Sequence, residues 1–243
     1  MPGIKLQSVS FRYQQTPVLQ NLSFEIKAGT FLGITGTNGS GKSTLLYLLN
    51  GLIPHEIPGR LSGKIFVDGI STRQKPVSFF AKTVGLVFQN PDFSLFNLTV
   101  KEELEFGLKN LKIKDSSGRI KQALNQVGMF NYLNRDPQTL SFGQKQKICL
   151  ASVLTLNTDY IVLDEPTAML DYRSSVELYE ILSKLNQSGK TIIVVEHDTD
   201  FLLKYSQQVL ILDAGKIKAF GPTKPIFSQT ALLKNSGVKI PRL

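Results

Sequence analysis

The sequence has little cysteine and no hydrophobic segment long enough to cross a membrane. Its 243 residues include a single cysteine, Cys149, so no disulfide can form within the chain, and this suits a reducing compartment. No apolar run approaches the roughly 20 residues that a transmembrane helix needs. Residues 1–5 lack the apolar block of a signal peptide. We therefore expect a cytoplasmic protein, with Cys149 in an apolar, helical part of the core.

Acidic residues are missing from the C-terminal part of the chain. After Asp213 the charged residues are all basic: Lys216, Lys218, Lys224, Lys234, Lys239 and Arg242. Such an excess, within a formal net charge of +9, is most often a solvated surface, although anionic lipid headgroups or nucleic acid also attract it. The sequence shows no zinc-ligand spacing, no aromatic RNA-binding signature and no heptad-linked basic region. We therefore favour a solvated or membrane-facing surface and expect no nucleic acid.

A glycine-rich loop that ends in Lys-Ser-Thr is the motif around which the chain is organised. Residues 36–44, GTNGSGKST, fit the pattern G-x-x-x-x-G-K-[ST] and lie between apolar runs at 31–35 and 45–49. At such a strand-to-helix turn, converging backbone N–H groups and the helix dipole bind phosphate. Lys42 would reach the terminal phosphates and Ser43 would offer its hydroxyl to Mg²⁺. A glycine-rich turn with a chance lysine is the alternative, but the fit at every constrained position favours nucleotide binding.

The hydrophobic pattern predicts an α/β protein, and the 42% hydrophobic content is typical of a globular chain with a sizeable core. Alternating apolar residues predict antiparallel strands at 4–11 and 22–26, and continuous apolar runs predict buried parallel strands at 160–163 and 191–195. Residues 100–156 are helical in pattern and more charged, which is typical of a helical subdomain inserted between strands. A hairpin at 209–218 and one short helix near 226–233 are expected to close the chain.

Polar residues follow three of the predicted strands. Asp164 and Glu165 follow 160–163, His197 follows 191–195, and Gln89 follows an apolar run at 84–88. Ligands of parallel sheets bind beyond the carboxyl ends of the strands. Because neighbouring side chains of an extended chain point opposite ways, Asp164 can face Mg²⁺ while Glu165 faces a water that attacks phosphorus. An amide such as Gln89 could ligate Mg²⁺ or hold a water, whereas a histidine at a strand end is more often structural than catalytic.

Two further features allow a structural and a functional interpretation. Tyr13 follows the first strand, where its ring could cap the strand end or provide a platform for an adenine base. Ser141 and Gly143 stand at the start of a predicted helix, where they could form an ordinary N-cap or a second anion site. Taken alone, the cap is the better interpretation of the second feature, and the first stays open.

Taken together, these motifs resemble those of the ATP-binding cassette (ABC) ATPases, the nucleotide-binding subunits of ABC transporters, along nearly the whole chain. Residues 36–44 resemble the Walker A motif and 160–165 the Walker B motif. Further matches are Gln89 to the Q-loop, 140–144 to the family signature, 168–171 to the D-loop, His197 to the switch histidine and Tyr13 to the adenine-stacking aromatic. Residues 88–92, FQNPD, with Leu95, Phe96, Thr99 and Val100, look like the ATPase of energy-coupling-factor importers, which take up vitamins or cobalt and nickel ions.

The resemblance implies a P-loop NTPase of the ABC-cassette fold, with a mixed core sheet, an antiparallel β subdomain and an inserted helical subdomain. Residues 1–243 would form a single ABC ATPase domain. Within it, residues 1–90 and 157–243 would form a RecA-like core with the antiparallel β subdomain, and about 91–156 the helical subdomain that carries the signature.

The resemblance also implies ATP and Mg²⁺ as cofactors and a role for each site residue. Tyr13 would stack on adenine, and the phosphates would be wrapped by Asn38, Gly39, Ser40, Gly41, Lys42, Ser43 and Thr44. The implied Mg²⁺ ligands are Ser43, Gln89 and Asp164. The implied catalytic residues are Glu165, which activates the attacking water, His197, which contacts the γ-phosphate, Gln89 and Lys42. Residues Ser141, Gly143 and Gln144 would bind the γ-phosphate of a nucleotide held by a second subunit.

The implied partners are a second ABC ATPase subunit, identical or paralogous, and integral membrane subunits docked near residues 89–96. The protein would then lie at the cytoplasmic face of the cell membrane and power an importer by ATP-driven closure of the dimer. The alternatives are the ATPase of another ABC transporter type, or a soluble ABC ATPase acting on nucleic acid or ribosomes. Phe142, Met169 and Tyr172 depart from the family's usual residues, and a bulky ring in the signature suggests a heterodimer with two unequal sites.

Overall fold

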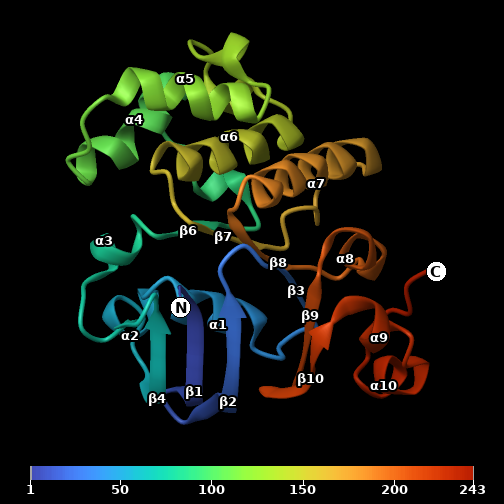
Figure 1. The fold of residues 1–243 in the computed structure, drawn as a ribbon. Coiled ribbons are helices and arrows are strands. Elements are labelled where there is room, and N and C mark those ends of the chain that lie inside the picture. Colours follow the sequence, from blue (N-terminus) through green and yellow to red (C-terminus); the bar gives the residue numbers. More distant parts are fainter. Residues whose placement is uncertain (1, 243) are drawn as a thin grey trace.

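Two β-sheets form the centre of the computed structural model, which describes residues 2–242 (Figure 1). The larger sheet has the order β10-β9-β3-β8-β7-β6, and all its neighbours are parallel except β9 and β10. Its strands are β3 (Phe31–Thr35), β6 (Val84–Val87), β7 (Tyr160–Asp164), β8 (Thr191–Val195), β9 (Gln208–Asp213) and β10 (Lys216–Pro222). The smaller, antiparallel sheet consists of β2 (Thr16–Lys27), β1 (Gly3–Tyr13), β4 (Arg60–Val67) and β5 (Ile70–Ser71), in that order.

Helices cover the sheets and fill the long connections. The connection from β6 to β7 carries α4 (Val100–Asn110), α5 (Ser116–Gln126) and α6 (Phe142–Thr155), which lie together at the top of Figure 1. The other helices are α1 (Lys42–Leu49), α2 (Leu52–His55), α3 (Val77–Phe80), α7 (Tyr172–Gln187), α8 (Thr199–Tyr205), α9 (Thr223–Phe227) and α10 (Thr230–Asn235). Short 3-10 turns occupy Pro91–Phe93, Phe130–Tyr132 and Pro137–Thr139. Within residues 2–242, no helix combines the length and apolarity that a membrane span requires.

The order of the parallel strands brings three connecting loops to one edge of the larger sheet. In the register of β3, β8 and β7, Ile34 lies opposite Val195, and Val195 lies opposite Asp164. The loops that follow these strands therefore begin side by side, and the backbone N–H of Glu196 donates to the carbonyl of Ile34 at 2.9 Å. The mixed sheet, the antiparallel sheet and the helical insertion between β6 and β7 confirm the predicted fold.

Strands β1 and β2 each contain an irregularity that keeps their apolar residues on the core side. In β1 the buried positions change from Ile4 and Leu6 to Val9 and Phe11, a shift of phase at Ser8, whose φ is 49°. In β2 the corresponding residue is Asn21, with φ 54°. The backbone N–H of Ser8 donates to the hydroxyl of Ser23 at 2.8 Å, so a side chain satisfies a group that the irregular ladder leaves unpaired.

The C-terminal segment differs from the prediction in its helices. One helix was expected near residues 226–233, but α9 ends at Phe227 and α10 begins at Thr230. The side chains of Ser228 and Gln229 both donate to the carbonyl of Pro225, at 2.9 and 3.1 Å. These side chains replace the backbone partner that a continuing helix would supply, and the helix stops there. The predicted hairpin is confirmed by the antiparallel pair β9 and β10.

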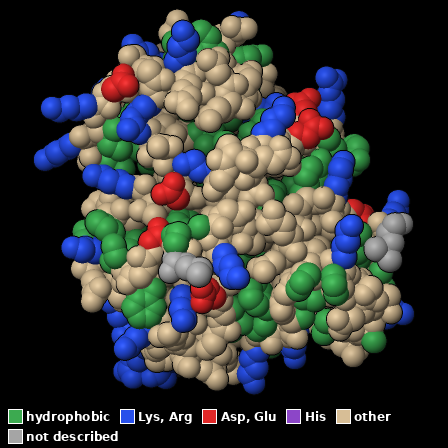
Figure 2. Space-filling model, viewed as in Figure 1, with side chains coloured by type: hydrophobic (Ala, Val, Ile, Leu, Met, Phe, Trp, Pro, Cys, Tyr) green, Lys and Arg blue, Asp and Glu red, His purple; other side chains and the backbone are tan. Residues whose placement is uncertain are grey.

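Part of the positive charge of the C-terminal segment is paired with acids from earlier elements. The ammonium of Lys218 lies 3.4 Å from a carboxylate oxygen of Asp213, and that of Lys239 lies 2.8 Å from Asp198 and 2.7 Å from Asp200. On the face shown in Figure 2, Lys and Arg side chains are spread over the helical part and the sheets alike. The basic character of the chain is therefore a property of much of its surface.

Core packing generates a stability prediction for β8. Ile193, at the centre of this strand, is fully buried among residues of both sheets and α1. We expect Ile193→Ala to lower the free energy of unfolding by about 2–5 kcal/mol, because it removes buried methyl groups and leaves a cavity. Urea unfolding followed by circular dichroism would measure this. Ile240→Ala is the matched control, since Ile240 is 39% exposed and should change stability by less than about 0.5 kcal/mol; equal losses would contradict the core assigned to β8.

Candidate functional site

The glycine-rich loop connects β3 to α1 and curls tightly against the neighbouring strand β9. Gly36, Gly39 and Gly41 have φ values of 149°, 74° and 101°. A Cβ at Gly36 would collide with the backbone carbonyl oxygen of Leu212 in β9, whereas a Cβ at Gly39 would meet nothing within 4 Å. Gly36 therefore lets the loop approach β9, and Gly39 lies where the loop opens to solvent.

Lys42 is buried inside this loop, with only 5% of its surface exposed. Its ammonium donates to the carbonyls of Gly36 and Thr37, at 3.1 and 3.0 Å. Burial lowers the pKa of Lys42, although the nearby carboxylates of Glu165 and Asp164 act in the opposite direction. Among the described residues, none forms an ion pair with Lys42. A buried cation held by two neutral carbonyls is a strong site for an anion at the mouth of the loop.

Asp164, the last residue of β7, has the properties of a metal ligand. Only 6% of it is exposed, and its Oδ1 atom has no hydrogen-bond partner within residues 2–242. Burial raises the pKa of Asp164, and the Ser43 hydroxyl opposes this shift. A carboxylate oxygen with unused bonding capacity beside a hydroxyl fits Mg²⁺, which takes one or two protein oxygens and completes its shell with phosphate and water. Within residues 2–242, no group of three or more His, Cys, Asp or Glu side chains is arranged so that it could hold a metal ion by itself.

Glu165 forms hydrogen bonds with two other predicted site residues. Its Oε2 accepts a hydrogen bond from the Gln89 amide at 3.0 Å, and its Oε1 lies 2.9 Å from His197 Nε2. Glu165 was expected to continue the extended strand, so that its side chain would point opposite to that of Asp164. The assumption of an extended backbone at Glu165 was wrong. The φ of Glu165 is +43°, a left-handed conformation, so the chain has left the extended geometry at this residue. Such strain at an acidic residue in a crevice is typical of functional sites.

Tyr13 lies beside the glycine-rich loop, at the last position of β1. Its hydroxyl is 3.2 Å from that of Thr44 in α1. Its ring packs edge to face on that of Phe11, with 4.8 Å between the ring centroids. These contacts hold an aromatic ring next to the phosphate loop. The stacking of adenine on Tyr13 stays a prediction.

The signature residues lie apart from this group of side chains. Ser141 and Gln144 form a capping box at the start of α6, with hydrogen bonds of 3.0 and 3.3 Å between them. The Gln144 amide also donates to the Tyr132 hydroxyl, and Gly143 faces Ser174 of α7. Among the described residues, no hydrogen bond joins Ser141 or Gln144 to the phosphate loop. The predicted N-cap is confirmed, and the second anion site stays a prediction.

Two residues of the site were not given a role by the sequence. The buried carboxylate of Glu196 accepts a hydrogen bond from the hydroxyl of Thr167, and it also accepts one from the backbone N–H of His197 at 2.8 Å. Glu196 had a signal in the sequence, because it directly follows an apolar strand as Asp164 ends one. Thr167 had none.

Comparison with known proteins agrees with this geometry. Residues 19–168 match the family model described as ABC transporter. The energy-coupling factor transporter ATP-binding protein EcfA of Methanocaldococcus jannaschii is 37% identical over 245 residues, which cover 99% of this chain and 86% of that one. Among solved structures, CbiO1 of Clostridium perfringens, described as part of the ABC transporter complex CbiONQ, aligns with a TM-score of 0.85 and 30% identity over 97% of this chain and 94% of that one.

A second solved structure is a dimeric ATP-binding cassette in a post-hydrolysis state, bound to ADP and Pi. It aligns with a TM-score of 0.80 and 28% identity, over 91% of this chain and 99% of that one. Fold and site together thus define a nucleotide-binding cassette. The chain belongs to the ABC transporter family, as one of its ATP-binding ATPases.

The burial of Asp164 generates a prediction on stability and pH. Because the folded-state pKa of Asp164 is raised, its charged form destabilises the nucleotide-free fold at neutral pH, and this cost disappears as the pH falls through the folded pKa. We expect Asp164→Asn to be more stable than the wild type by about 1 kcal/mol at neutral pH, with a smaller difference in mild acid. Denaturant unfolding at both pH values measures it.

Asp159→Asn serves as the control for this measurement. The Asp159 side chain is 73% exposed just before β7, so its substitution should change stability by less than about 0.5 kcal/mol. A loss of stability in Asp164→Asn at neutral pH would contradict the assigned sign.

Proposed function

We propose that this chain is the ATP-hydrolysing subunit of a membrane importer of the energy-coupling-factor type, for vitamins or transition-metal ions. The observation that carries the proposal is the convergence of Lys42, Asp164 and Glu165 on one side of the glycine-rich loop, with Gln89 and His197 bonded to Glu165. The similarity to EcfA and CbiO1 supports the subtype. We further propose the division into a core of residues 1–90 and 157–243 and a helical subdomain of about 91–156.

In the proposed mechanism the protein accelerates phosphoryl transfer by positioning and by charge. Lys42 and the backbone N–H groups of residues 38–44 bind the phosphates, while Tyr13 stacks on adenine. Bound Mg²⁺, held by Ser43, Gln89 and Asp164, would neutralise charge on the phosphate oxygens. Glu165 orients the attacking water and accepts its proton, and His197 contacts the γ-phosphate. The 2.9 Å contact between His197 and Glu165 holds these two residues together before nucleotide arrives.

A second subunit would complete the site. Ser141 and Gly143 lie at the start of α6 and make no hydrogen bond to the phosphate loop within residues 2–242. We propose that they, with Gln144, bind the nucleotide of a partner cassette, identical or paralogous, and the dimeric state of one structural relative supports this. Met169, in the loop between Glu165 and α7, and Tyr172, the first residue of α7, are both largely exposed, which suits residues that a partner covers.

A groove beside Gln89 offers a surface for membrane subunits. Its volume is about 660 Å³, and it lies between the end of β6, the turn at Pro91–Phe93, α4 and α6. Its aromatic lining includes Phe93, which is 88% exposed, Phe96 and Phe106. Exposed apolar patches of this kind mark interaction sites. Because Gln89 lines the groove and also bonds Glu165, a protein docked there would be coupled directly to the hydrolytic site. This arrangement would place the chain at the cytoplasmic face of the membrane.

Hydrolysis is tested with Glu165→Gln. The variant should bind Mg-ATP with an affinity within about threefold of the wild type, because the phosphate-binding residues are intact, while turnover falls by at least about a hundredfold. ATP should then accumulate a dimer that is visible in size-exclusion chromatography. Lys42→Ala is the companion variant and should lose nucleotide binding itself. Wild-type turnover in Glu165→Gln would remove Glu165 from its proposed role.

Docking is tested with Phe93→Ser. The substitution deletes the most exposed aromatic side chain of the groove, so recovery of membrane subunits with the ATPase from detergent-solubilised membranes should fall by about tenfold or more. ATP binding by the isolated chain should not change. Phe130→Ser is the matched control, because Phe130 is also partly exposed but lies outside the groove. Co-purification of nucleic acid in place of membrane subunits would favour the soluble ABC ATPase instead.

A further inference from the structure

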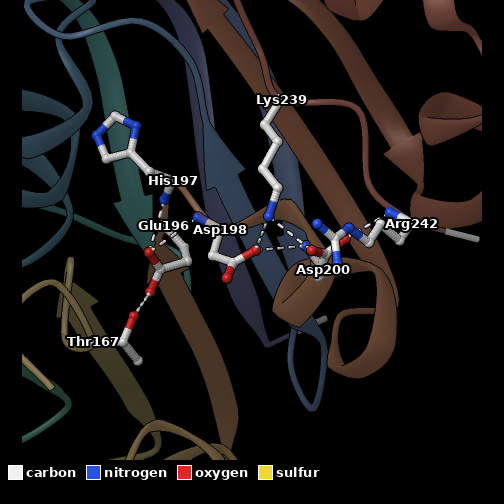
Figure 3. A network of polar contacts seen from close by, with 7 residues as sticks. All are labelled: Thr167, Glu196, His197, Asp198, Asp200, Lys239 and Arg242. Carbon is white, nitrogen blue, oxygen red and sulfur yellow. Dashed lines mark hydrogen bonds and ion pairs between the residues drawn. The ribbon is translucent and has the colours of Figure 1, made fainter. Parts of the chain in front are cut away.

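Glu196 is a buried carboxylate to which the proposed hydrolytic mechanism assigns no step. Only 3% of it is exposed, and Figure 3 shows its side chain between Thr167 and the backbone of His197. Its oxygens accept three hydrogen bonds: from the Thr167 hydroxyl, from His197 N at 2.8 Å and from Asp198 N at 3.3 Å. Burial raises the pKa of Glu196, and these donors oppose the shift. Burying a carboxylate costs free energy unless it is hydrogen-bonded, and here the hydrogen-bond donors come from two different loops.

These donors make Glu196 a link between the loops that carry Glu165 and His197. Thr167 follows Glu165 by two residues in the loop after β7, and Glu196 precedes His197 in the loop after β8. Among the described residues, two hydrogen bonds between side chains join these loops. One link, between Glu165 and His197 at 2.9 Å, is accessible to solvent, since the His197 side chain is 43% exposed. The other, between Thr167 and Glu196, is buried.

The buried link can persist when the exposed one breaks. If His197 turns to a phosphate group, it gives up its bond to Glu165. Among the described residues, the bond between Thr167 and Glu196 is then the side-chain hydrogen bond that still joins the two loops, while the backbone N–H of Glu165 keeps its bond to the carbonyl of Val195 at the end of β8. Glu196 leaves the His197 ring free, because its carboxylate accepts a hydrogen bond from the backbone N–H of His197 and not from the imidazole. The backbone of His197 is therefore fixed while its side chain can move.

The far side of the same loop is held as well. Asp198 and Asp200 both bond the ammonium of Lys239, at 2.8 and 2.7 Å, and the Arg242 backbone N–H donates to Asp200 at 2.6 Å (Figure 3). The loop after β8 thus lies between the loop after β7 and the C-terminal segment. Two sets of contacts thus hold the loop and the start of α8 from opposite sides: Glu196 bonds the main chain of the loop, and the C-terminal segment bonds the side chains of Asp198 and Asp200.

We propose that Glu196 is a positioning residue for ATP hydrolysis: through its hydrogen bonds to Thr167 and to the backbone of His197, it sets the distance between the imidazole of His197 and the carboxylate of Glu165. This inference rests on the proposed function, since it concerns the alignment of the two groups that act on the γ-phosphate and the attacking water. Glu196 itself touches neither.

The kinetic test uses Thr167→Val, which removes the hydroxyl and keeps the volume. We expect kcat for ATP to fall by about tenfold to a hundredfold, because misalignment of about 1 Å has effects of this size. The KM should stay within about twofold, because residues 36–44 are untouched. Thr167→Ser should restore kcat, since it keeps the donor. Glu196→Gln should retain most of the activity, because its amide can accept from His197 N and donate to the Thr167 hydroxyl, whereas Glu196→Ala should behave like Thr167→Val.

The matched control is Thr158→Val. Thr158 is also buried, its hydroxyl has no partner among the described residues, and it lies before β7, at the end of the strand away from the site. It should leave kcat unchanged. Equal losses of kcat in Thr158→Val and Thr167→Val would overturn the proposal, because the effect would then follow from any buried Thr→Val substitution.

A spectroscopic test uses the presence of only two histidines, His55 and His197. With ¹³C-labelled histidine, NMR should show two ring signals, which His55→Gln assigns. Thr167→Val should shift the His197 signal and leave the His55 signal in place, since His55 bonds the carbonyl of Thr72 elsewhere in the fold. Thr158→Val should move neither signal.

The outcomes separate this inference from the proposed function. Folded Thr167→Val and Glu196→Ala with wild-type kcat and an unmoved His197 signal would overturn the role of Glu196 while the ATPase assignment stands. A wild-type chain without ATPase activity, or full activity in Glu165→Gln, would overturn the proposed hydrolytic mechanism. The His197 signal would still report whether the bond between Thr167 and Glu196 positions the imidazole.

Discussion

The burial of the Lys42 ammonium among neutral carbonyls is the constraint on which the rest of the structure depends. The loop can wrap this cation only because Gly36 comes close to β9 without a side chain, and because β3 delivers the loop to the same edge as β7 and β8. Lys42 has no ion-pair partner among the described residues, and the acids nearby lower the cost of its charge without pairing with it. Under the proposed function a phosphate group would supply the missing partner, for which the loop is already arranged.

The site combines a fixed main chain with side chains that can exchange partners. Parallel strands fix where each loop begins, and backbone hydrogen bonds such as that from Glu196 N to the Ile34 carbonyl keep neighbouring loops together. The side chains of Gln89, Glu165 and His197, by contrast, form hydrogen bonds only with one another among residues 2–242. A ligand can rearrange these two bonds at little cost to the fold, which suits a catalytic cycle with distinct nucleotide states.

Much of the fold was predictable, because its signals are local. The runs at 160–163 and 191–195 predicted the strands β7 (Tyr160–Asp164) and β8 (Thr191–Val195), and the glycine-rich loop fitted its pattern at every fixed position. The left-handed conformation of Glu165 and the break at Ser228 were not predictable, since each depends on contacts specific to the folded chain. The same holds for the bond between Thr167 and Glu196, which joins residues 29 positions apart. Sequence motifs therefore located the candidate site, while the contacts that align it required the structure.

The aromatic groove beside Gln89 has a consequence for how such a subunit is made in the cell. Phe93 is 88% exposed and Phe96 is 62% exposed, and so much apolar surface in water favours self-association. Under the proposed function, a chain synthesised in excess of its membrane partner would expose this apolar surface in the cytosol, where chaperones and proteases recognise it. The cell would then have to make the two components in balanced amounts, because the exposed phenylalanine side chains of the groove need a partner that covers them.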